Sequence, residues 1–456
     1  MQTVGLISEH ASPLAVAGSI DAGGQNVYVA HVARHLAQLG FAVDVFTRRE
    51  SDGQPAVVEW LPGVRVVHVP AGPAAVLPKE ALLPYMGEFG EFLVGYCRQR
   101  ACSGRPYDLL HANFFMSGVA GMAAKTELGI PLVVTFHALG KVRRRHQGSA
   151  DGFPDERFEI EEALVRDADR VIAECPQDRA DLIDLYGAES ERIEIVPCGF
   201  DGSEFYPVDR MTARAALGWD AGAYSILQLG RIVPRKGVDN VIRSVAALRD
   251  LHGAAVRLYI VGGNSDEPNP IATPEIARLQ RVAADCGVEG QVAFVGRRAR
   301  EQLRLFYGAS DVFVTTPWYE PFGITPVEAM ACAVPVIGAR VGGIQSTVAD
   351  GHTGYLVPPN DPLALACRLR HLMGNPARAH ALGANGRQRA HSLYTWAGVA
   401  QSLAAVYRRV TRHRKVFALA RTATAEVARH TGRYTRTASF AQVSGGDARL
   451  GTRSSR

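Results

Sequence analysis

Two glutamates separated by seven residues are the first candidates for binding a ligand with several hydroxyl groups. Glu320 follows the apolar run DVFVTTP, and Glu328 follows the turn at Gly323. A helix beginning near Gly323 leaves the N–H groups of Ile324 and Thr325 unpaired, which makes an anion site. Glu328 could then accept hydrogen bonds from the vicinal hydroxyls of a ribose, and Glu320 from those of a sugar. The alternative, solvated carboxylates on a capped helix, is disfavoured by the intervening FGIT.

A second group of charged residues lies directly after the apolar run YSILQLG. The turn GRIVPRKG places Arg231 at the end of this run and Lys236 five residues later. Arginine donates paired hydrogen bonds to phosphate oxygens, and lysine supplies a point charge. The spacing predicts that both side chains converge on a diphosphate. A basic surface turn is the alternative.

Two more segments place useful residues where predicted strands end. The loop DAGGQN carries Gly24 and Asn26 after the first strand, and paired glycines let the backbone approach a ligand closely. The loop lacks the GxGxxG pattern and the acidic residue of a dinucleotide site. His137 ends the run PLVVTFH, so we expect it to face the ligand edge of the sheet. A buried structural histidine is the alternative.

These motifs lie in a chain that alternates apolar runs with amphipathic helical segments. Seven strand-like runs precede the Gly-, Pro- and Asp-rich segment PCGFDGSEFYP, and six follow it. This alternation predicts doubly wound parallel sheets. We therefore expect an α/β protein with two Rossmann-like domains facing a cleft, at residues 1–200 and 208–390, and a further helix at 395–412. Ligands bind such sheets at the carboxyl ends of the strands.

Composition is that of a soluble globular protein. The 456 residues are 47% hydrophobic and 21% charged, which excludes global disorder, a fibre and a coiled coil. No apolar run is long enough to span a bilayer, and the N-terminus does not resemble a signal peptide. We expect a cytoplasmic protein. We leave a homodimer open.

The formal net charge of +5 is unevenly distributed. Residues 411–456 hold ten Lys or Arg and two Asp or Glu, while the remainder holds 40 basic and 43 acidic residues. A nearly neutral body argues against nucleic-acid binding. We expect residues 413–456 to form a basic, largely disordered tail. A weak electrostatic contact of this tail with an anionic membrane is one alternative, and a solvated tail is the other.

Metal and disulfide chemistry find little support in the sequence. The seven cysteines are scattered without a CxxC pair, which predicts buried free thiols. The pair Asp167 and Asp169 lies where a helix meets a strand, and we interpret it as part of that helix end. We expect no metal site and no cofactor.

Together these motifs resemble the family 4 retaining glycosyltransferases, which have the GT-B fold. The two glutamates with FGIT, the GR…K turn, the DAGGQNVYV loop and the PCGFDGSEFYP linker carry this resemblance over about residues 2–410. It implies an N-terminal acceptor-binding domain and a C-terminal domain that binds a nucleotide sugar. It also implies that the helix at 395–412 crosses back to the first domain.

The resemblance also implies roles for individual residues. His137, Glu320, Arg231 and Lys236 become the candidate catalytic residues, with His137 positioning the donor sugar. Further positions match donor-binding or acceptor-binding residues. The implied donor-binding residues are Arg231, Lys236, Arg298, Glu320, Gly323, Ile324, Thr325 and Glu328, and the implied acceptor-binding residues are Gly24, Asn26, Lys79 and Arg157.

Two branches of that family are most similar, and both take phosphorylated acceptors. They are the sucrose-phosphate synthases and the inositol-phosphate N-acetylglucosaminyltransferases of mycothiol synthesis. The resemblance to the second implies that Lys79 and Arg157 bind the acceptor phosphate. Phe114 and Ala138 stand where that branch has a tyrosine and a threonine that touch the phosphate. The identity of the acceptor therefore stays open.

The expected activity is retaining transfer of a hexosyl unit from a nucleotide-diphosphate sugar, with UDP as the expected nucleotide. The acceptor would be a hydroxyl of a sugar phosphate, a cyclitol phosphate or a glycan. A sugar-nucleotide epimerase or hydrolase, a transferase acting on a lipid or polysaccharide, and a non-catalytic nucleotide-sugar-binding module are the alternatives.

Overall fold

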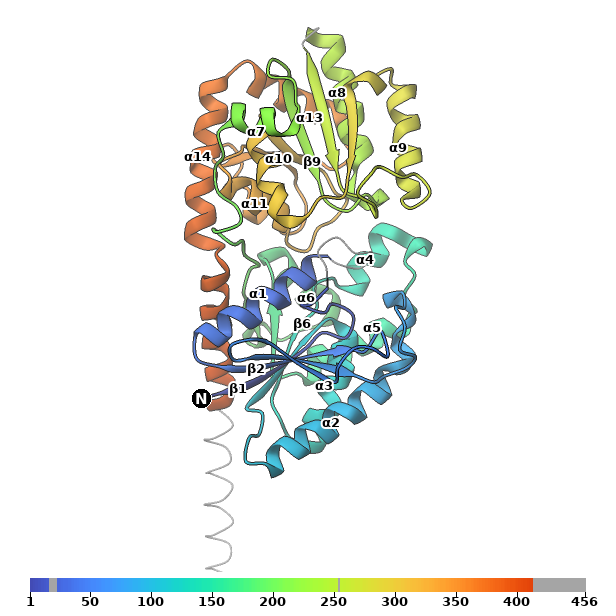
Figure 1. Ribbon diagram of the computed structural model, residues 1–456, viewed down its shortest axis with the longest axis vertical. Coiled ribbons are helices and arrows are strands. Elements are labelled where there is room, and N and C mark those ends of the chain that lie inside the picture. The colour runs from blue at the N-terminus through green and yellow to red at the C-terminus, as the bar shows by residue number, and fades with distance from the viewer. Residues whose placement is uncertain (16–22, 253–254, 413–456) are drawn as a thin grey trace, which may run out of the picture. The chain divides into compact units, whose positions relative to one another are not determined.

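The computed structural model describes residues 1–15, 23–252 and 255–412, and side chains within that part except those of residues 249–252. The chain divides into a unit from Met1 to Val406 and a unit from Tyr407 to Arg456. The first unit contains both predicted α/β sheets (Figure 1). The predicted tail at 413–456, and Asp21 and Ala22 of the glycine loop, lie outside the described residues.

The N-terminal sheet has eight strands. They are β1 (Thr3–Ile7), β2 (Ala42–Arg48), β3 (Val57–Leu61), β4 (Val64–Val69), β5 (Leu109–Asn113), β6 (Leu132–Thr135), β7 (Arg170–Ala173) and β8 (Ile193–Ile195). Their order is β3-β4-β2-β1-β5-β6-β7-β8, and only the β3–β4 pair is antiparallel. The seven predicted strands are confirmed. The sequence analysis missed β3, a half-exposed edge strand without a continuous apolar run.

Helices cover both faces of this sheet. They are α1 (Gly24–Gln38), α2 (Met86–Cys102), α3 (Phe115–Leu128), α4 (Gly140–Gln147), α5 (Glu156–Asp167) and α6 (Pro176–Tyr186). One hydrophobic core unites the sheet with α2, α3, α5 and α6. On the opposite face, the Trp396 ring stacks on His31 of α1 at 5.2 Å and meets the Tyr28 ring edge-on at 5.8 Å. The helical residues 396–406 therefore do return to the N-terminal sheet.

The C-terminal sheet has six strands, all parallel. They are β9 (Tyr224–Leu229), β10 (Val256–Val261), β11 (Val292–Gly296), β12 (Val312–Thr315), β13 (Val336–Ala339) and β14 (Gly354–Val357), in the order β11-β10-β9-β12-β13-β14. All six were predicted. Most of their residues are buried, as expected where helices cover both faces of a parallel sheet.

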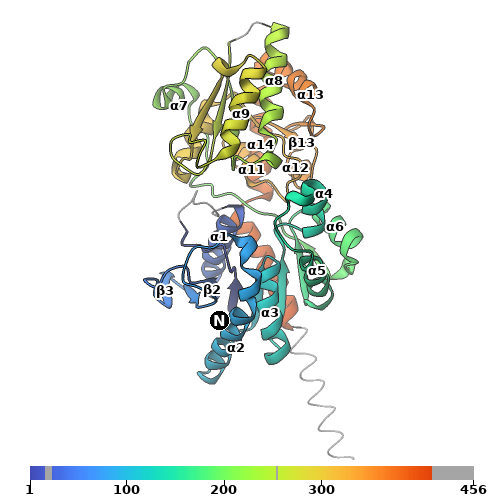
Figure 2. The same cartoon turned by 90° about the vertical axis from the view of Figure 1, so that its right-hand side faces the viewer.

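Eight helices accompany this second sheet. They are α7 (Arg210–Leu217), α8 (Val238–His252), α9 (Pro274–Asp285), α10 (Leu303–Ala309), α11 (Ile324–Ala331), α12 (Ile344–Thr347), α13 (Pro362–Met373) and α14 (Pro376–Leu393). Helices α8, α9 and α13 lie together over one face (Figures 1 and 2), and their apolar residues share one core. The two α/β layers confirm the predicted doubly wound fold.

Strand order reverses next to β1 and β5 in the first sheet, and next to β9 and β12 in the second. Such switch points leave an open crevice at the carboxyl ends of the strands, where ligands bind. The glycine loop follows β1, the GR…K turn follows β9, and the two-glutamate element follows β12. The chain order thus places three of the sequence motifs at switch points.

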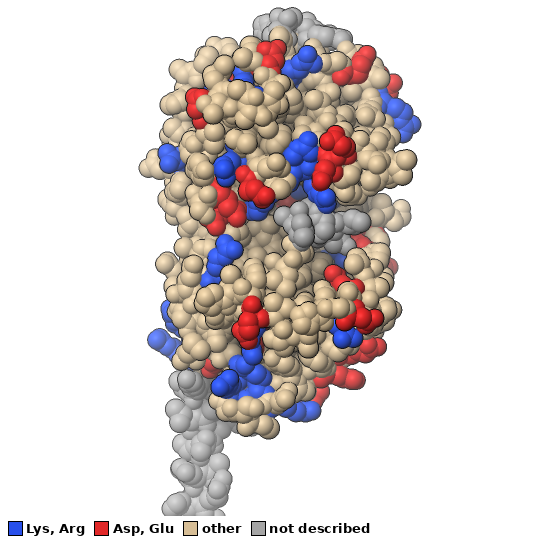
Figure 3. All heavy atoms as spheres, in the orientation of Figure 1, with Lys and Arg blue, Asp and Glu red and all other residues tan. Residues whose placement is uncertain are grey.

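Charged side chains of both signs are intermixed on the face drawn in Figure 3. No helix within the described ranges is both long and apolar enough to cross a membrane. The seven cysteines are free thiols. The prediction that all of them are buried is wrong, because Cys102 and Cys367 are exposed on helix surfaces.

Candidate donor and acceptor site

The GR…K turn and the two-glutamate element lie against each other. Gly237 has φ +61°, and a Cβ there would come within 2.0 Å of the Thr316 carbonyl oxygen. Only glycine allows this approach, which brings the turn after β9 against the residue that follows β12. The Trp318 N–H also donates to the Arg235 carbonyl at 2.8 Å. Two segments about 80 residues apart are thereby fixed side by side.

This approach pairs the two side chains predicted to contact the donor. The Lys236 ammonium donates to the Glu320 carboxylate, and both side chains are about one-sixth exposed. Burial lowers the pKa of Lys236 to about 8, against the attraction of Glu320. Burial also tends to raise the pKa of Glu320, but Lys236 and Arg235 outweigh it and lower that pKa. Glu320 is therefore an anion held by cations.

The start of α11 lies next to this pair. Gly323 precedes the helix with φ +90°, and no side chain caps it. The first N–H groups, from Ile324 and Thr325, therefore remain donors for an anion. A Cβ on Gly24 would lie 3.4 Å from the Ile324 side chain. The glycine loop after β1 thus faces the helix start after β12, as a cleft between the two sheets requires.

Glu328 lies one turn into α11 and is 2% exposed. Its Oε2 accepts a hydrogen bond from the Tyr307 hydroxyl at 3.1 Å, and its Oε1 lies 2.9 Å from Arg300 Nη1. Oε1 nevertheless accepts no hydrogen bond of acceptable geometry from the described residues. A buried carboxylate oxygen left in this way can accept a hydrogen bond from a ligand hydroxyl.

The two remaining predicted donor residues follow β9 and β11, which lie on either side of β10 in the sheet. Arg231 is exposed directly after β9, and its charge lowers the pKa of both Lys236 and Glu320. Arg298 follows β11, and its guanidinium donates to the carbonyl oxygens of Asp266 and Arg297 at 2.5 and 2.7 Å. Its side chain thus fixes the loop after β11.

His137 lies at the carboxyl end of β6 with a positive φ of 58°. Its Nδ1 is 2.8 Å from Glu174 Oε1, and its Nε2 is 3.1 Å from Asn113 Oδ1. Asn113 ends β5 and Glu174 follows β7. Three adjacent strand ends thus fix one imidazole. The sequence analysis found His137 but missed both partners, which lie 24 and 37 residues away and carry no motif.

The predicted acceptor residues of the glycine loop contact protein groups. Asn26 Oδ1 accepts a hydrogen bond from the Gly23 N–H at 3.0 Å, and Asn26 Nδ2 donates to the Ser12 carbonyl at 3.0 Å. Asn26 therefore shapes the loop, and its contact with an acceptor ring stays a prediction. The sequence analysis passed over Gln25, which donates to the Asn113 carbonyl at 3.0 Å and ties the loop to β5.

The two predicted phosphate ligands differ in exposure. The Lys79 ammonium is 17% exposed and lies 4.0 Å from Glu80. Arg157 is fully buried: its Nε bonds to Glu161 Oε1 at 2.7 Å, and its Nη2 donates to the Ala138 carbonyl. Arg157 Nη1 is buried without a hydrogen-bond partner among the described residues.

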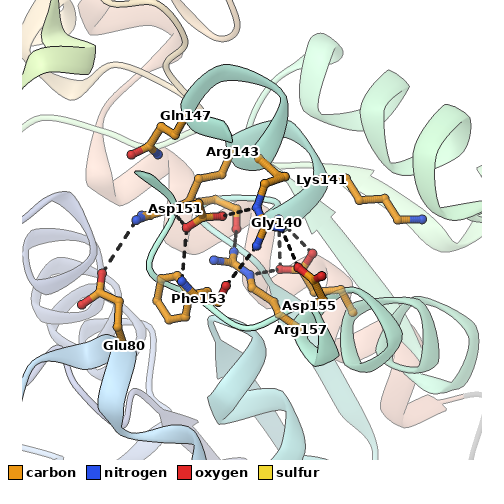
Figure 4. Close-up of polar contacts among 12 residues, drawn as sticks. Glu80, Gly140, Lys141, Arg143, Gln147, Asp151, Phe153, Asp155 and Arg157 are labelled. Carbon is orange, nitrogen blue, oxygen red and sulfur yellow. Dashed lines mark hydrogen bonds and ion pairs between the residues drawn. The ribbon is translucent and has the colours of Figure 1, made fainter. Parts of the chain in front are cut away.

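Carboxylates surround the basic residues of this region (Figure 4). Arg143 lies between Asp151 at 2.6 Å and Glu80 at 3.7 Å, and Arg144 lies 2.5 Å from Asp155. The guanidinium of Arg157 also stacks over three aromatic rings at 4.7–4.9 Å. The rings belong to Phe114, Phe115 and Phe153. The predicted phosphate pocket is thus electrically balanced rather than strongly basic.

Loops that follow strands of the two sheets contact each other beside Glu320 and border a small, half-open cavity. The Gln147 amide donates to the Tyr319 hydroxyl at 2.6 Å, and the His146 ring stacks on Tyr319 at 5.1 Å. The cavity has a volume of about 230 Å³ and is lined by residues from both sides, including Ala138 and Glu320. Polar groups from the loops of both sheets therefore line one half-open cavity.

Potential metal ligands also gather at one place in the described chain. His31, Asp201 and Glu204 offer ligand atoms within 4.8 Å of one another. Cations already face both carboxylates, because Arg300 donates to Glu204 at 2.6 Å and Arg34 lies 3.9 Å from Asp201. This group is an ion-pair network. Asp169, which the sequence analysis assigned to a helix end, pairs with Lys125.

Comparisons with known proteins agree with this arrangement. Residues 23–199 match a glycosyl transferase 4-like domain, and residues 209–389 match the glycosyl transferases group 1. The chain is 37% identical to a D-inositol 3-phosphate glycosyltransferase of Kineococcus radiotolerans, over 91% of this chain and 97% of the relative. A protein of the same name from Streptosporangium roseum is 39% identical, over 89% and 92% of the two chains.

Solved structures give the same result for the fold. The sucrose-phosphate synthase of Thermosynechococcus elongatus is similar with a TM-score of 0.82 and 34% identity, over 91% of this chain and all of the other. The HepE protein of Anabaena, solved with UDP-glucose, has a TM-score of 0.67 at 20% identity over 90% of this chain and all of the other, and supports the fold alone. The chain therefore belongs to the group 1 and 4-like glycosyltransferases and has their GT-B fold.

Proposed function

We propose that this glycosyltransferase moves a hexosyl unit, with retention, from a UDP-sugar to a hydroxyl of a cyclitol phosphate or a sugar phosphate. The observation that carries the proposal is the meeting of Lys236 and Glu320 beside the uncapped start of α11. The cation Lys236, the N–H donors at the start of α11 and the partly buried carboxylate of Glu320 match a diphosphate joined to a sugar.

The charged groups of the donor site stabilise the charge that develops on the donor during the reaction. Cleavage of the anomeric bond leaves negative charge on the diphosphate, and Lys236, Arg231 and the helix start stabilise that charge. Preorganised groups of this kind give the largest catalytic contribution in many enzymes. Glu328 accepts hydrogen bonds from the ribose, and Glu320 from the transferred sugar. We propose that the nucleotide is UDP, as the family resemblance implies.

Retention requires that the acceptor hydroxyl attack the anomeric carbon from the face that the diphosphate leaves, and we propose that the departing diphosphate oxygen takes the hydroxyl proton. We propose an oxocarbenium-like transition state, in which His137 positions the donor sugar. Its ring nitrogens are already paired with Glu174 and Asn113, so its role is orientation rather than proton abstraction. Closure of the cleft excludes water and holds the acceptor hydroxyl near the anomeric carbon.

The acceptor assignment rests on the relatives and on two side chains. The relatives named D-inositol 3-phosphate glycosyltransferase support a cyclitol phosphate, and the sucrose-phosphate synthase supports a sugar phosphate. We propose Lys79 as a phosphate ligand because its ammonium is partly exposed. Arg157 can contribute only Nη1, the guanidinium nitrogen that has no hydrogen-bond partner among the described residues.

A panel assay tests the proposal. UDP release is measured for several UDP-sugars, each without acceptor, with inositol 3-phosphate, with fructose 6-phosphate, and with the unphosphorylated parents. We expect turnover only with a phosphorylated acceptor. Release without any acceptor would favour a hydrolase or epimerase, and turnover with lipid or neutral acceptors alone would overturn the acceptor assignment.

The pH profile should report Lys236. Its pKa is lowered to about 8 in the free protein, so the charged ammonium is progressively lost above that pH. Because kcat/KM reports the ionisations of free enzyme, kcat/KM for the donor should fall above about pH 8. The variant Lys236→Arg keeps its charge throughout, so whatever activity it retains should stay level between pH 8 and pH 9.5. An unchanged alkaline fall in this variant would exclude Lys236 as its source.

Cellular context adds two smaller proposals. We propose that the protein works in the cytoplasm, and that its basic residues 413–456 make a weak electrostatic contact with anionic membranes. Cosedimentation of the full chain with phosphatidylserine vesicles, against neutral vesicles, tests the contact. Whether the protein forms a homodimer is tested by sedimentation velocity.

A further inference from the structure

Arg300 joins the predicted ribose ligand to the segment that links the two sheets. It begins a short 3-10 turn, Arg300–Gln302, that leads into α10. Its Nε donates to Glu204 Oε2 at 2.6 Å, and its Nη1 lies 2.9 Å from Glu328 Oε1. Its guanidinium also stacks over the Phe205 ring at 4.8 Å. One side chain thus contacts the linker at two points and Glu328 at a third.

Contacts with Tyr307 and Arg300 fix the orientation of the Glu328 carboxylate. Tyr307 holds Oε2 with a hydrogen bond, and Arg300 faces Oε1 with its charge. Burial of an unpaired carboxylate is costly, and the Arg300 guanidinium supplies the opposite charge beside Glu328. The geometry between Arg300 and Oε1 is an ion pair without a good hydrogen bond, which leaves a lone pair of Oε1 available.

We infer that Arg300 is a positioning residue for nucleotide recognition: it holds Glu328 in the orientation in which this carboxylate accepts hydrogen bonds from the ribose hydroxyls. The inference rests on the proposed function, since it requires a nucleoside-diphosphate donor. The linker in turn sets Arg300, because Glu204 and Phe205 hold the guanidinium from the other side.

The test compares the binding affinities of two nucleotides and does not depend on catalytic activity. Binding of UDP and of 2′,3′-dideoxy-UDP is measured by titration calorimetry. The dideoxy nucleotide keeps the base and the diphosphate, but it lacks the two ribose hydroxyls that would donate hydrogen bonds to Glu328. A hydrogen bond to a charged group contributes about 1.5–3 kcal/mol, so the wild type should prefer UDP by roughly 10- to 100-fold.

Arg300→Met should reduce that preference at least fivefold, while the affinity for the dideoxy nucleotide changes less than about twofold. Arg300→Lys should keep part of the preference, because lysine has the positive charge but lacks the paired N–H groups of the guanidinium. Arg304→Met is the matched control: Arg304 stacks over linker Tyr206 at 5.3 Å and is four residues further on. It should keep the wild-type preference.

Three outcomes would count against this assignment. If Arg300→Met weakens both nucleotides equally, or keeps the full preference, Arg300 has only a structural role and the inference is wrong. If Arg300→Met does not fold, unchanged preference in Arg300→Lys and in Glu204→Gln together overturns it. If the wild type binds no UDP, or does not distinguish the two nucleotides, the proposed donor site itself fails, which is a separate result.

Discussion

Replacing Lys236 with alanine should lower kcat/KM for the donor by about 10²- to 10³-fold, the range seen when one preorganised donor to a developing oxyanion is removed. Lys236 lies at the carboxyl end of β9, where its ammonium already contacts Glu320. In the variant the departing diphosphate loses this cation, and Glu320 loses its partner. The loss should therefore persist in kcat at saturating donor.

Initial rates of UDP release, with donor and acceptor varied separately, check this expectation. Lys125→Ala is the matched control. Lys125 lies on α3, away from the strand ends that form the site, and it forms a comparable ion pair with Asp169. It should retain nearly full activity. Full activity of Lys236→Ala at saturating donor would remove Lys236 from the mechanism.

The donor half of the site was predictable because each of its motifs directly follows a strand. Parallel strands covered on both faces are nearly continuous apolar runs, so β9 and β12 are visible in the sequence. Their neighbouring positions follow from strand order, which brings the ends of both strands to one crevice. The family resemblance implied that Lys236 and Glu320 both bind the donor, and the structure brings them into direct contact.

The residues that the sequence analysis missed depend on contacts rather than on patterns. Glu174 and Asn113 meet His137 only because β5, β6 and β7 are neighbours in the sheet. Arg300 lies in a turn without a motif, and its role emerges from its two carboxylate partners. Edge strand β3 was missed for another reason, since an exposed strand needs no apolar run.

Arg157 shows where a residue's identity was predictable and its environment was not. The resemblance implied that Arg157 is a phosphate ligand, and the structure buries both Arg157 and Glu161 completely. The spacing of four residues on α5 was the available signal for this pair. Glu161 also accepts a hydrogen bond from the Gly140 N–H at 2.9 Å and one from the Tyr186 hydroxyl. The pair thus supports the turn that follows His137.

Replacing Arg157 with methionine should therefore lower the free energy of unfolding by about 3–5 kcal/mol, the cost of leaving a buried charge without its partner. Glu161→Gln should have a similar effect, because it isolates the guanidinium instead. The double variant should lose less than the sum of the two, by roughly 0.5–3 kcal/mol. Urea unfolding followed by circular dichroism measures all three variants.

Arg166→Met on the same helix is the matched control, since Arg166 pairs with Asp167 at 2.9 Å with both side chains exposed. Exposed pairs contribute about 0–1 kcal/mol, so this variant should be nearly as stable as the wild type. The acceptor KM separates the two roles of Arg157, because Glu161→Gln keeps the guanidinium while Arg157→Met removes it. If Arg157→Met is as stable as Arg166→Met and raises only the acceptor KM, Arg157 is a phosphate ligand without a structural role. If Arg157→Met loses stability and raises the acceptor KM, while Glu161→Gln leaves that KM unchanged, Arg157 both supports the His137 turn and offers Nη1 to the phosphate.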